Sequence, residues 1–205
     1  MQRNLLKRIL LTTVLSGFVF SPAILFYFYP KNTIQESKPI LLIKKAIDSL
    51  KKEQPRQGLP IRLKIPKINV DTALEYVGLT PEGDIGVPTD PFNAAWYELG
   101  PRPGEKGNAI ITGHFGWKNG ISAVFDDLYK LTKGDKIYIE DETGTTTTFV
   151  VRESRRYVPK ADASYVFISN GENSHLNLIT CEGVWNKDQK SYSKRLVVFT
   201  DKEIK

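Results

Sequence analysis

Short runs of alternating apolar and polar residues dominate the chain from residue 61 onward, and turn residues separate them. Alternation with a period of two is typical of β-strands that bury one face. The pattern predicts strands at 61–65, 72–77, 109–112, 136–140, 147–157, 176–180 and 195–200. One helix is predicted at 121–131, where Val124, Phe125, Leu128 and Leu131 fall on one face. Seven or eight strands with long connections favour a closed, mostly β barrel over an open sheet.

A different pattern occupies the N-terminal end of the chain. Residues 9–30 form an apolar run without a charged residue, and Arg3, Lys7 and Arg8 precede it. A helix of that length spans about 30 Å, the thickness of the hydrocarbon core of a membrane. The run is longer than the apolar part of a usual cleavable signal peptide, and no small-residue cleavage site follows it, so we interpret it as an uncleaved anchor. The basic residues before it predict a cytoplasmic N-terminus and an extracytoplasmic domain.

These patterns divide the chain into a basic tail (1–8), a transmembrane segment (9–30), a linker (31–60) and an extracytoplasmic domain (61–205). Within the linker, Ile40, Ile43, Ile47 and Leu50 recur at helical spacing and predict an amphipathic helix at 38–52. This helix either packs on the domain or lies on the membrane surface with its lysines near lipid phosphates.

The formal net charge of +6 is distributed unevenly. Up to Gln57 the chain has ten Lys and Arg residues and three acidic residues. From Gly58 onward it has nineteen Lys and Arg residues and twenty acidic residues. The excess therefore lies beside the apolar run, where basic residues set topology or contact anionic lipids. The nearly neutral domain argues against nucleic acid as a partner.

Cys181 is the only cysteine of the chain, so no intramolecular disulfide can form. In a cytosolic protein, a lone cysteine is typically a buried and inert thiol. On the oxidising side of a membrane, an unpaired thiol requires an explanation, and catalysis is one.

Three predicted strands begin or end with one reactive side chain each. His114 ends the segment ITGH, Cys181 ends LITC, and Arg195 begins RLVVF. Each residue alone has an ordinary explanation as a structural histidine, a core thiol or a solvated arginine. Together they supply a nucleophile, a proton carrier and a fixed positive charge, which is the set required for thiol acyl transfer. Two histidines and one cysteine do not form a plausible metal-ligand set, and no cofactor is predicted.

The TGH, ITC and RLVVF segments, in this order and spacing, resemble the signature of the sortases, a family of cysteine transpeptidases. The resemblance runs from about residue 61 to residue 199. The segments IPKI, VGLTPEGDIGVP and AWYELGPRPGEKGNAIITGH, all before Cys181, are most similar to class E and class F sortases. Asn177 departs from the pattern, since many sortases have Thr at the start of a TLxTC motif. L,D-transpeptidases, a second Cys/His family, have Gly directly before the cysteine and Arg close after it, so Thr180 and the distant Arg195 exclude that match.

The resemblance implies an eight-stranded barrel with short helices, in which His114, Cys181 and Arg195 lie at the ends of neighbouring strands. It also implies that residues 158–174 and 182–193 are two loops that frame a substrate groove. The other histidine, His175, lies six residues before Cys181, some 20 Å along an extended strand, which leaves His114 as the partner of the thiol. The segment at 90–92, Asp-Pro-Phe, is similar to the lid motif of pilus-building sortases, but its place inside the domain indicates a turn.

The resemblance further implies a reaction and its partners. Cys181 would attack the Thr–Gly carbonyl of an LPxTG-like sorting signal, with Arg195 and the backbone N–H of Glu182 facing the oxyanion. Thr180 would orient Arg195 or the substrate backbone, and His114 would protonate the leaving amine. An amine from a peptidoglycan precursor or a pilin would then resolve the thioacyl enzyme. The implied partners are surface proteins that bear the signal, the amine acceptor and the membrane.

Two other functions stay open at this point. A thiol peptidase that only hydrolyses its substrate would carry the same residues, because the choice of acceptor depends on groove shape and on access of water. A non-catalytic domain that binds cell-wall peptides would have no need of all three reactive side chains.

Overall fold

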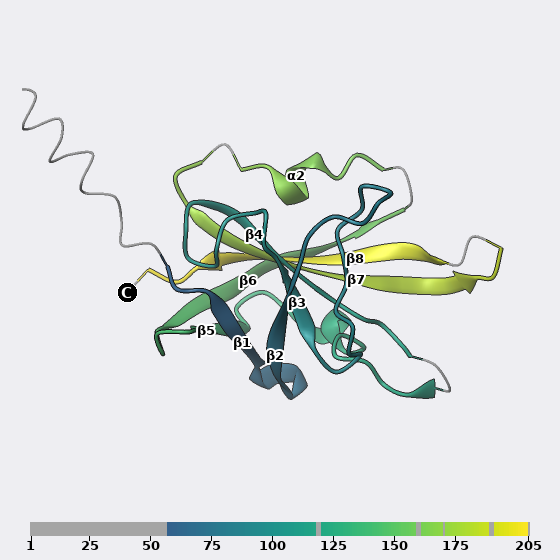
Figure 1. Ribbon diagram of the computed structural model, residues 1–205, viewed down its shortest axis with the longest axis horizontal. Helices are drawn as coiled ribbons and strands as arrows, with labels where there is room; N and C mark the ends of the chain where they lie inside the picture. Colours follow the sequence, from purple (N-terminus) through teal and green to yellow (C-terminus); the bar gives the residue numbers. More distant parts are fainter. Residues whose placement is uncertain (1–56, 118–119, 159–160, 170, 189–190, 205) are drawn as a thin grey trace, which may run out of the picture. The chain divides into compact units, whose positions relative to one another are not determined.

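Eight strands close into a barrel in the order β1-β2-β3-β4-β7-β8-β6-β5 (Figure 1). The computed structural model describes residues 57–204, except 118–119, 159–160, 170 and 189–190. The strands are β1 (Pro60–Ile65), β2 (Val70–Val77), β3 (Ala94–Tyr97), β4 (Gly107–Gly113), β5 (Lys136–Asp141), β6 (Thr146–Tyr157), β7 (Ser174–Asn186) and β8 (Ser191–Lys202). The short helices are η1 (Pro66–Ile68), η3 (Leu128–Lys130) and α2 (Ser164–Phe167). The predicted closed barrel of eight strands is therefore confirmed.

The predicted basic tail, transmembrane segment and linker helix lie outside the described residues. Over the part of the chain that the structure describes, no helix has the length and apolar character needed to cross a membrane.

β7 lies between β4 and β8, and this position determines the geometry of the site. β4 pairs with β7 in parallel, with Thr112 opposite Ile179. β8 pairs with β7 antiparallel, with Cys181 opposite Arg195. β2 and β3 form the second parallel pair, and the remaining neighbours are antiparallel.

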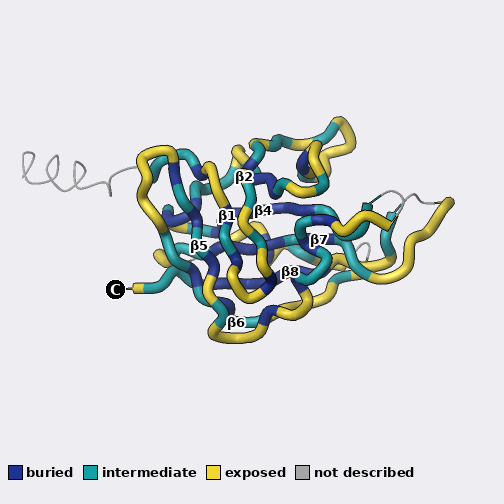
Figure 2. Tube along the Cα trace, turned by 90° about the horizontal axis from the view of Figure 1, so that it is seen from below, coloured by how far each residue is buried: buried dark blue, intermediate teal, exposed yellow. Residues whose placement is uncertain are grey.

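The barrel interior is filled by one face of each strand, as the alternation of the sequence predicts (Figure 2). On β7 and β8, the inward residues are Leu176, Leu178, Leu196 and Val198. The largest fully buried side chains of this core are Phe125 and Phe149, and Trp96 is 3% exposed. Complete burial of this many branched and aromatic side chains gives the strand ends a rigid base.

A second, smaller core lies on the outer face of β4, β7 and β8. Ile110, Val197 and Phe199 are buried there beneath Val166 of α2. The same outer face carries Cys181, because Cys181 and Ile179 are two residues apart and Ile179 packs on this cluster. The predicted loop 158–174 thus contains a helical turn that covers part of this face.

Strand β3 was not predicted, and the predicted helix at 121–131 is wrong. All of β3 except Tyr97 is buried, so its sequence shows no alternation. In the region 121–131, only η3 is helical. The backbone N–H groups that a helix would use internally instead reach other segments: Val124 donates to Pro91 and Phe125 donates to His114. The apolar side chains of this region do pack into the core, but they lie on turns and a short 3-10 helix rather than on one α-helix.

The expectation that residues 182–193 form a loop is also wrong. β7 continues to Asn186 and β8 begins at Ser191, so the two strands project beyond the barrel as a hairpin (Figure 1). The register shifts between Glu182 and Trp185, where Gly183 adopts a φ of 91°. A β-bulge of this kind increases the local twist of the hairpin.

Candidate active site

The predicted reactive residues come together at the ends of three adjacent strands. Cys181 and Arg195 are directly opposite each other on β7 and β8, so their side chains share one face with Cβ atoms about 5 Å apart. Thr112 pairs with Ile179, and continuing this register by two residues sets His114 beside Cys181. Neighbouring strands are separated by about 4.8 Å, and β7, which carries Cys181, lies between β4, which His114 follows, and β8, which carries Arg195.

Thr180 connects the strand of the histidine to the strand of the cysteine. Its buried hydroxyl donates to the carbonyl of Gly113 over 2.8 Å. This contact differs from the expected one, in which Thr180 orients Arg195 or the substrate. By alternation, the Thr180 side chain points away from the face that carries Cys181. The hydroxyl instead ties the last residue of β4 to β7, one residue before both His114 and Cys181.

Position 113, at the end of β4, has no room for a side chain, so only glycine fits there. A Cβ at this position would lie 2.7 Å from Cε2 of Phe125 and 2.8 Å from Cγ1 of Val124. The amide of Phe125 also donates to the carbonyl of His114 over 3.1 Å. The backbone around His114 is therefore held between β7 on one side and the Phe125 segment on the other.

The imidazole of His114 has a defined tautomer when it is neutral. Its Nε2 lies 2.8 Å from the carbonyl oxygen of Pro88. Because a carbonyl oxygen only accepts, Nε2 carries the hydrogen and Nδ1 keeps the basic lone pair. The ring of Trp117 packs edge-on against the imidazole with centroids 4.7 Å apart. These two contacts orient the ring and leave one nitrogen to exchange a proton.

Two opposing effects act on the thiol of Cys181. Burial raises its pKa above the ordinary value, and the positive charge of Arg195 lowers it in part. The protonated thiol therefore predominates at neutral pH. A neighbouring base would be needed to accept the proton of this thiol, and His114, two residues beyond the last β4–β7 pair, is the candidate.

Arg195 is partly held by its own hairpin. One guanidinium nitrogen, Nη1, donates to the carbonyls of Tyr192 and Lys194, each over 3.1 Å. A guanidinium has five N–H groups, so further donors are available to an oxyanion. The carboxylate of Glu182 forms a bidentate pair with Arg156 at 2.7 and 2.9 Å. By alternation this side chain points away from the Cys181 face, so only the backbone of Glu182 is a candidate for the oxyanion site.

Tyr192 joins the loop after His114 to the hairpin of Cys181 and Arg195. Its ring packs edge-on against Phe115 at 5.4 Å and against Trp185 at 5.1 Å. Burial raises the pKa of Tyr192, and the charges of Cys181 and Asp126 raise it further. Asp126 in turn accepts the N–H of Gly116 at 2.6 Å. Aromatic and hydrogen-bond contacts thus connect the two sides of the site.

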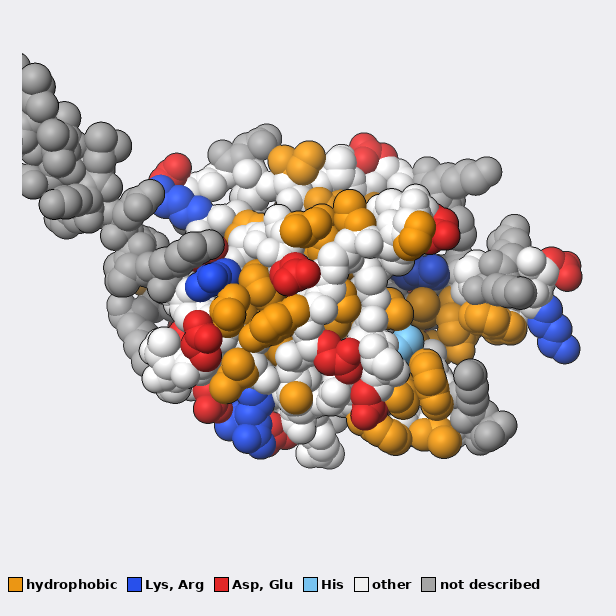
Figure 3. All heavy atoms as spheres, in the orientation of Figure 1, with side chains coloured by type: hydrophobic (Ala, Val, Ile, Leu, Met, Phe, Trp, Pro, Cys, Tyr) orange, Lys and Arg blue, Asp and Glu red, His pale blue; other side chains and the backbone are white. Residues whose placement is uncertain are grey.

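The arrangement can carry out nucleophilic acyl transfer by a thiol. In Figure 3, hydrophobic side chains surround a histidine and a basic side chain at the end of the barrel where the hairpin projects. Among the residues that the structure describes, no three His, Cys, Asp or Glu side chains are grouped as a metal ion would require.

Pro88 and Tyr192 were not identified from the sequence. Pro88 acts through its carbonyl, which any residue would supply, and only its place at the end of the VGLTPEGDIGVP segment could have indicated it. Tyr192 was assigned to a loop, and only its spacing of three residues from Arg195 could have drawn attention to it.

Comparison with known proteins gives a family and a fold. A family model described as the sortase domain matches residues 63–203. Sortase A from Corynebacterium diphtheriae, in a lid mutant, is 21% identical with a TM-score of 0.56, covering 83% of this chain and 82% of that one. Sortase C-1 from Actinomyces oris is 22% identical with a TM-score of 0.54, covering 71% and 72%. Sortase C1 from Streptococcus agalactiae is 23% identical with a TM-score of 0.55, covering 71% and 69%. These structures have the same barrel, whereas curated proteins give no match.

Proposed function

Because the chain belongs to the sortase family of cysteine transpeptidases, we propose that His114, Cys181 and Arg195 are its catalytic residues and that its substrate carries an LPxTG-like sorting signal. The observation that carries the assignment of these residues is the strand register. It sets Cys181 directly opposite Arg195 and puts His114 at the end of the strand on the other side.

The first half of the reaction forms a thioacyl enzyme. Nδ1 of His114 accepts the proton of the Cys181 thiol, and the thiolate attacks the carbonyl carbon of the Thr–Gly bond. The free N–H groups of Arg195 and the backbone N–H of Glu182 stabilise the negative oxygen of the tetrahedral intermediate. As the C–N bond breaks, the protonated His114 returns the proton to the leaving amine. The products are a thioester at Cys181 and a peptide with a new amino terminus.

The second half of the reaction transfers the acyl group. An incoming primary amine loses a proton to His114 and attacks the thioester carbonyl, and the thiolate of Cys181 leaves as the amide forms. The acceptor is an amine of a peptidoglycan precursor or of a pilin. Water in its place would give hydrolysis, which is the thiol peptidase alternative.

The location of the enzyme is part of the proposal. The apolar run at 9–30 with its preceding basic residues supports a single-pass membrane protein with a cytoplasmic N-terminus and an extracytoplasmic catalytic domain. The segments before His114 support assignment to class E or class F. The donor substrates would then be surface proteins that present the sorting signal at the same membrane.

Intact mass of the full chain after incubation with an acetylated LPxTG-type peptide tests the function. We expect an adduct with the mass of the acyl fragment, which an added amine such as triglycine releases as a ligated peptide. Cys181→Ala should form no adduct. Release only as the free acid, whatever the amine concentration, would identify a peptidase instead.

Arg195 can be tested with a matched control. Arg62 is also an exposed arginine at a strand position, paired with Asp71 and remote from the site in the barrel order. Arg195→Ala should slow adduct formation about 100-fold, as loss of an oxyanion donor does in other acyl transferases, and Arg62→Ala should leave it unchanged. Equal rates for the two variants would remove Arg195 from the mechanism.

A further inference from the structure

A carboxylate on β2 contacts the segment that holds His114. Glu75 is a half-buried residue of β2, and its side chain accepts three hydrogen bonds from the connection between β2 and β3. Oε2 accepts the N–H of Thr89 over 2.7 Å, and Oε1 accepts the N–H of Asp90 over 3.2 Å and Nδ2 of Asn93 over 3.0 Å. In the described part of the chain, no positively charged side chain pairs with Glu75. Neutral donors alone therefore surround its charge.

The strand register brings Glu75 and His114 to one face of the barrel wall. Glu75 is aligned with Ala95 on β3, and Ala95 with Thr112 on β4. His114 lies two residues beyond Thr112, so its side chain points to the same face. The hydroxyl of Thr112 donates to the carbonyl of Gly86 over 3.1 Å. The connection between β2 and β3 is thus fastened to β2 on one side and to β4 on the other.

One peptide group joins this carboxylate to the imidazole. The C=O of Pro88 and the N–H of Thr89 belong to the same peptide unit, and none of the described peptide bonds is cis. In a trans peptide the two groups point in opposite directions. The C=O accepts Nε2–H of His114 over 2.8 Å, and the N–H donates to Glu75 over 2.7 Å. The path from Oε2 of Glu75 to Nε2 of His114 is therefore about 8 Å long and consists of two hydrogen bonds and one planar group.

We propose that Glu75 is a positioning residue that stabilises the protonated form of His114 through this peptide group. Hydrogen bonds in series polarise one another, so a carboxylate that accepts the N–H makes the C=O of the same peptide a stronger acceptor. A stronger acceptor favours the imidazolium, because hydrogen bonds from a charged donor are the stronger ones. The imidazolium forms when His114 takes the proton of Cys181, so the inference rests on the proposed function.

Glu75 carries its charge at neutral pH. Burial raises the pKa of Glu75, but the hydrogen bonds from Thr89, Asn93 and Asp90 outweigh burial and hold that pKa below its ordinary value. A unit charge about 8 Å away changes a protonation equilibrium about twofold at the dielectric constant of water and about 30-fold at an effective value of about 20. Between these limits, we expect the charge of Glu75 to favour the imidazolium of His114 by about tenfold.

The ratio of imidazolium to neutral imidazole at His114 tests the proposal. NMR of the full chain, labelled with nitrogen-15 in its histidine rings, gives this ratio at a fixed pH where both forms are present. Glu75→Gln keeps the size of the side chain and removes its charge, so the ratio should fall about tenfold. The other charged or titratable groups near His114 are the same in both proteins: Cys181, Arg195 and Asp126. An unchanged ratio would overturn the proposal.

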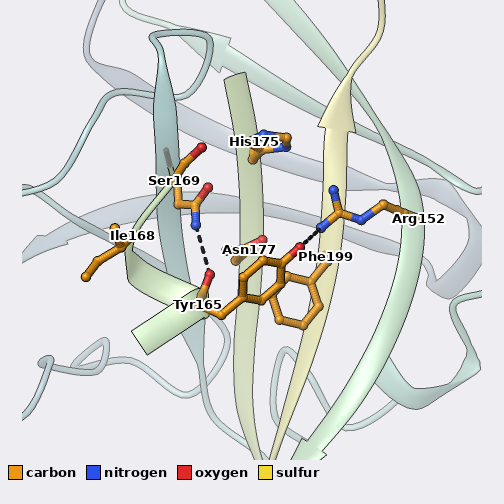
Figure 4. A pocket seen from close by; sticks show the side chains of 8 residues that line it. Arg152, Tyr165, Ile168, Ser169, His175, Asn177 and Phe199 are labelled. Carbon is orange, nitrogen blue, oxygen red and sulfur yellow. Dashed lines mark hydrogen bonds between the residues drawn. The ribbon is translucent and has the colours of Figure 1, made fainter. Parts of the chain in front are cut away.

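His175 is an internal control in the same spectrum. It is the only other histidine of the chain and lies toward the beginning of β7 (Figure 4). Its Nδ1 lies 2.7 Å from Asp201, so it belongs to a different set of contacts. The ratio at His175 should be the same in the wild type and in Glu75→Gln. A fall of equal size at both histidines would mean a general change in the fold and would also overturn the proposal.

Kinetics separate this role from simple anchoring of the connection. In Glu75→Gln, the rate of thioacyl-enzyme formation at saturating peptide should fall about tenfold. The peptide concentration that gives half of this rate should stay the same, because Glu75 acts on His114 and not on the substrate. Asn93→Ala removes one hydrogen bond to Oε1 and leaves both the charge and the bond to Thr89, so most of the wild-type rate should remain. Equal losses in the two variants would show that Glu75 only anchors the connection.

Glu140→Gln is the matched control. Glu140 is also a carboxylate on a strand, but it pairs with Lys64 and lies on β5, opposite β4 in the closed barrel order. Its rate of adduct formation and its ratio at His114 should equal those of the wild type. The ratio requires no substrate. If the wild type forms no adduct with any sorting peptide, the proposed function fails, and the ratio at His114 still decides the role of Glu75.

Discussion

The space around Gly113 allows a quantitative test of how the fold positions His114. In Gly113→Ala, the new methyl group would lie 2.7 Å from Cε2 of Phe125, whereas ordinary contact begins at 3.4 Å. Cδ2 of the same ring would lie closer still, so one of the two groups must move by more than about 0.7 Å. Phe125 is fully buried, so it has little room to give. The bond from its amide to the carbonyl of His114 transmits the movement to the histidine.

Two effects of different size should follow from this substitution. Overpacking of a well-packed core lowers the free energy of unfolding by about 1–3 kcal/mol. A catalytic group displaced by about 1 Å lowers the rate by about 100-fold. We therefore expect Gly113→Ala to remain folded at 25 °C, with kcat/KM for acyl transfer reduced between about 10-fold and 100-fold.

Urea unfolding and steady-state kinetics on the same preparations measure both effects. Gly78→Ala is the matched control, because a methyl group there would have no heavy atom within 4 Å. Its activity should equal that of the wild type. Combining Gly113→Ala with Phe125→Leu removes ring atoms from the clash and should restore part of the lost activity. Wild-type kcat/KM in Gly113→Ala would show that the contact with Phe125 does not position His114.

Two other predictions concern neighbours of the site. Thr180→Val removes the buried hydroxyl and its hydrogen bond to the carbonyl of Gly113, so it should lower the free energy of unfolding by about 1 kcal/mol, while Thr180→Ser should lose much less. Equal losses in urea unfolding would contradict a role for the bond. Arg195→Gln removes the charge that lowers the pKa of the Cys181 thiol, so that pKa should rise further and alkylation by iodoacetamide should require higher pH. A pH profile of alkylation identical to that of the wild type would disprove this electrostatic effect, and Arg62→Gln serves as its control.

The strands could be predicted where the sequence alternates or where an apolar run is long. β6 alternates and was located. β4 and β8 are buried on both faces, and their longer apolar runs were located too, whereas β3 has only four residues and was missed. The periodicity at 121–131 was correct about which side chains are buried and wrong about the backbone. Val124 and Phe125 donate their N–H groups to Pro91 and His114, and a one-dimensional pattern contains no information about such distant partners.

The candidate site was predicted from residue types, and its supports were not. His114, Cys181 and Arg195 stood out because thiol chemistry requires those side chains. The contact between Thr180 and Gly113 depends on which strands are neighbours. The contact between His114 and the carbonyl of Pro88 involves a group that every residue possesses. Such interactions are determined by the parallel pairing of β4 and β7, which is visible only in three dimensions.

The parallel pairing of β4 with β7 also has a consequence for folding. It joins Thr112 to Ile179, and β1 closes the barrel on β5 by joining Arg62 to Glu140, so both contacts bridge long stretches of chain. Non-local pairings of this kind form late and slowly, because the entropy of closing a long loop must be overcome first. The hairpin of β7 and β8 is local and can form early, with Cys181 and Arg195 already opposite each other. Until β4 docks, that hairpin lacks its histidine, so an incompletely folded chain carries an ordinary thiol with no base beside it.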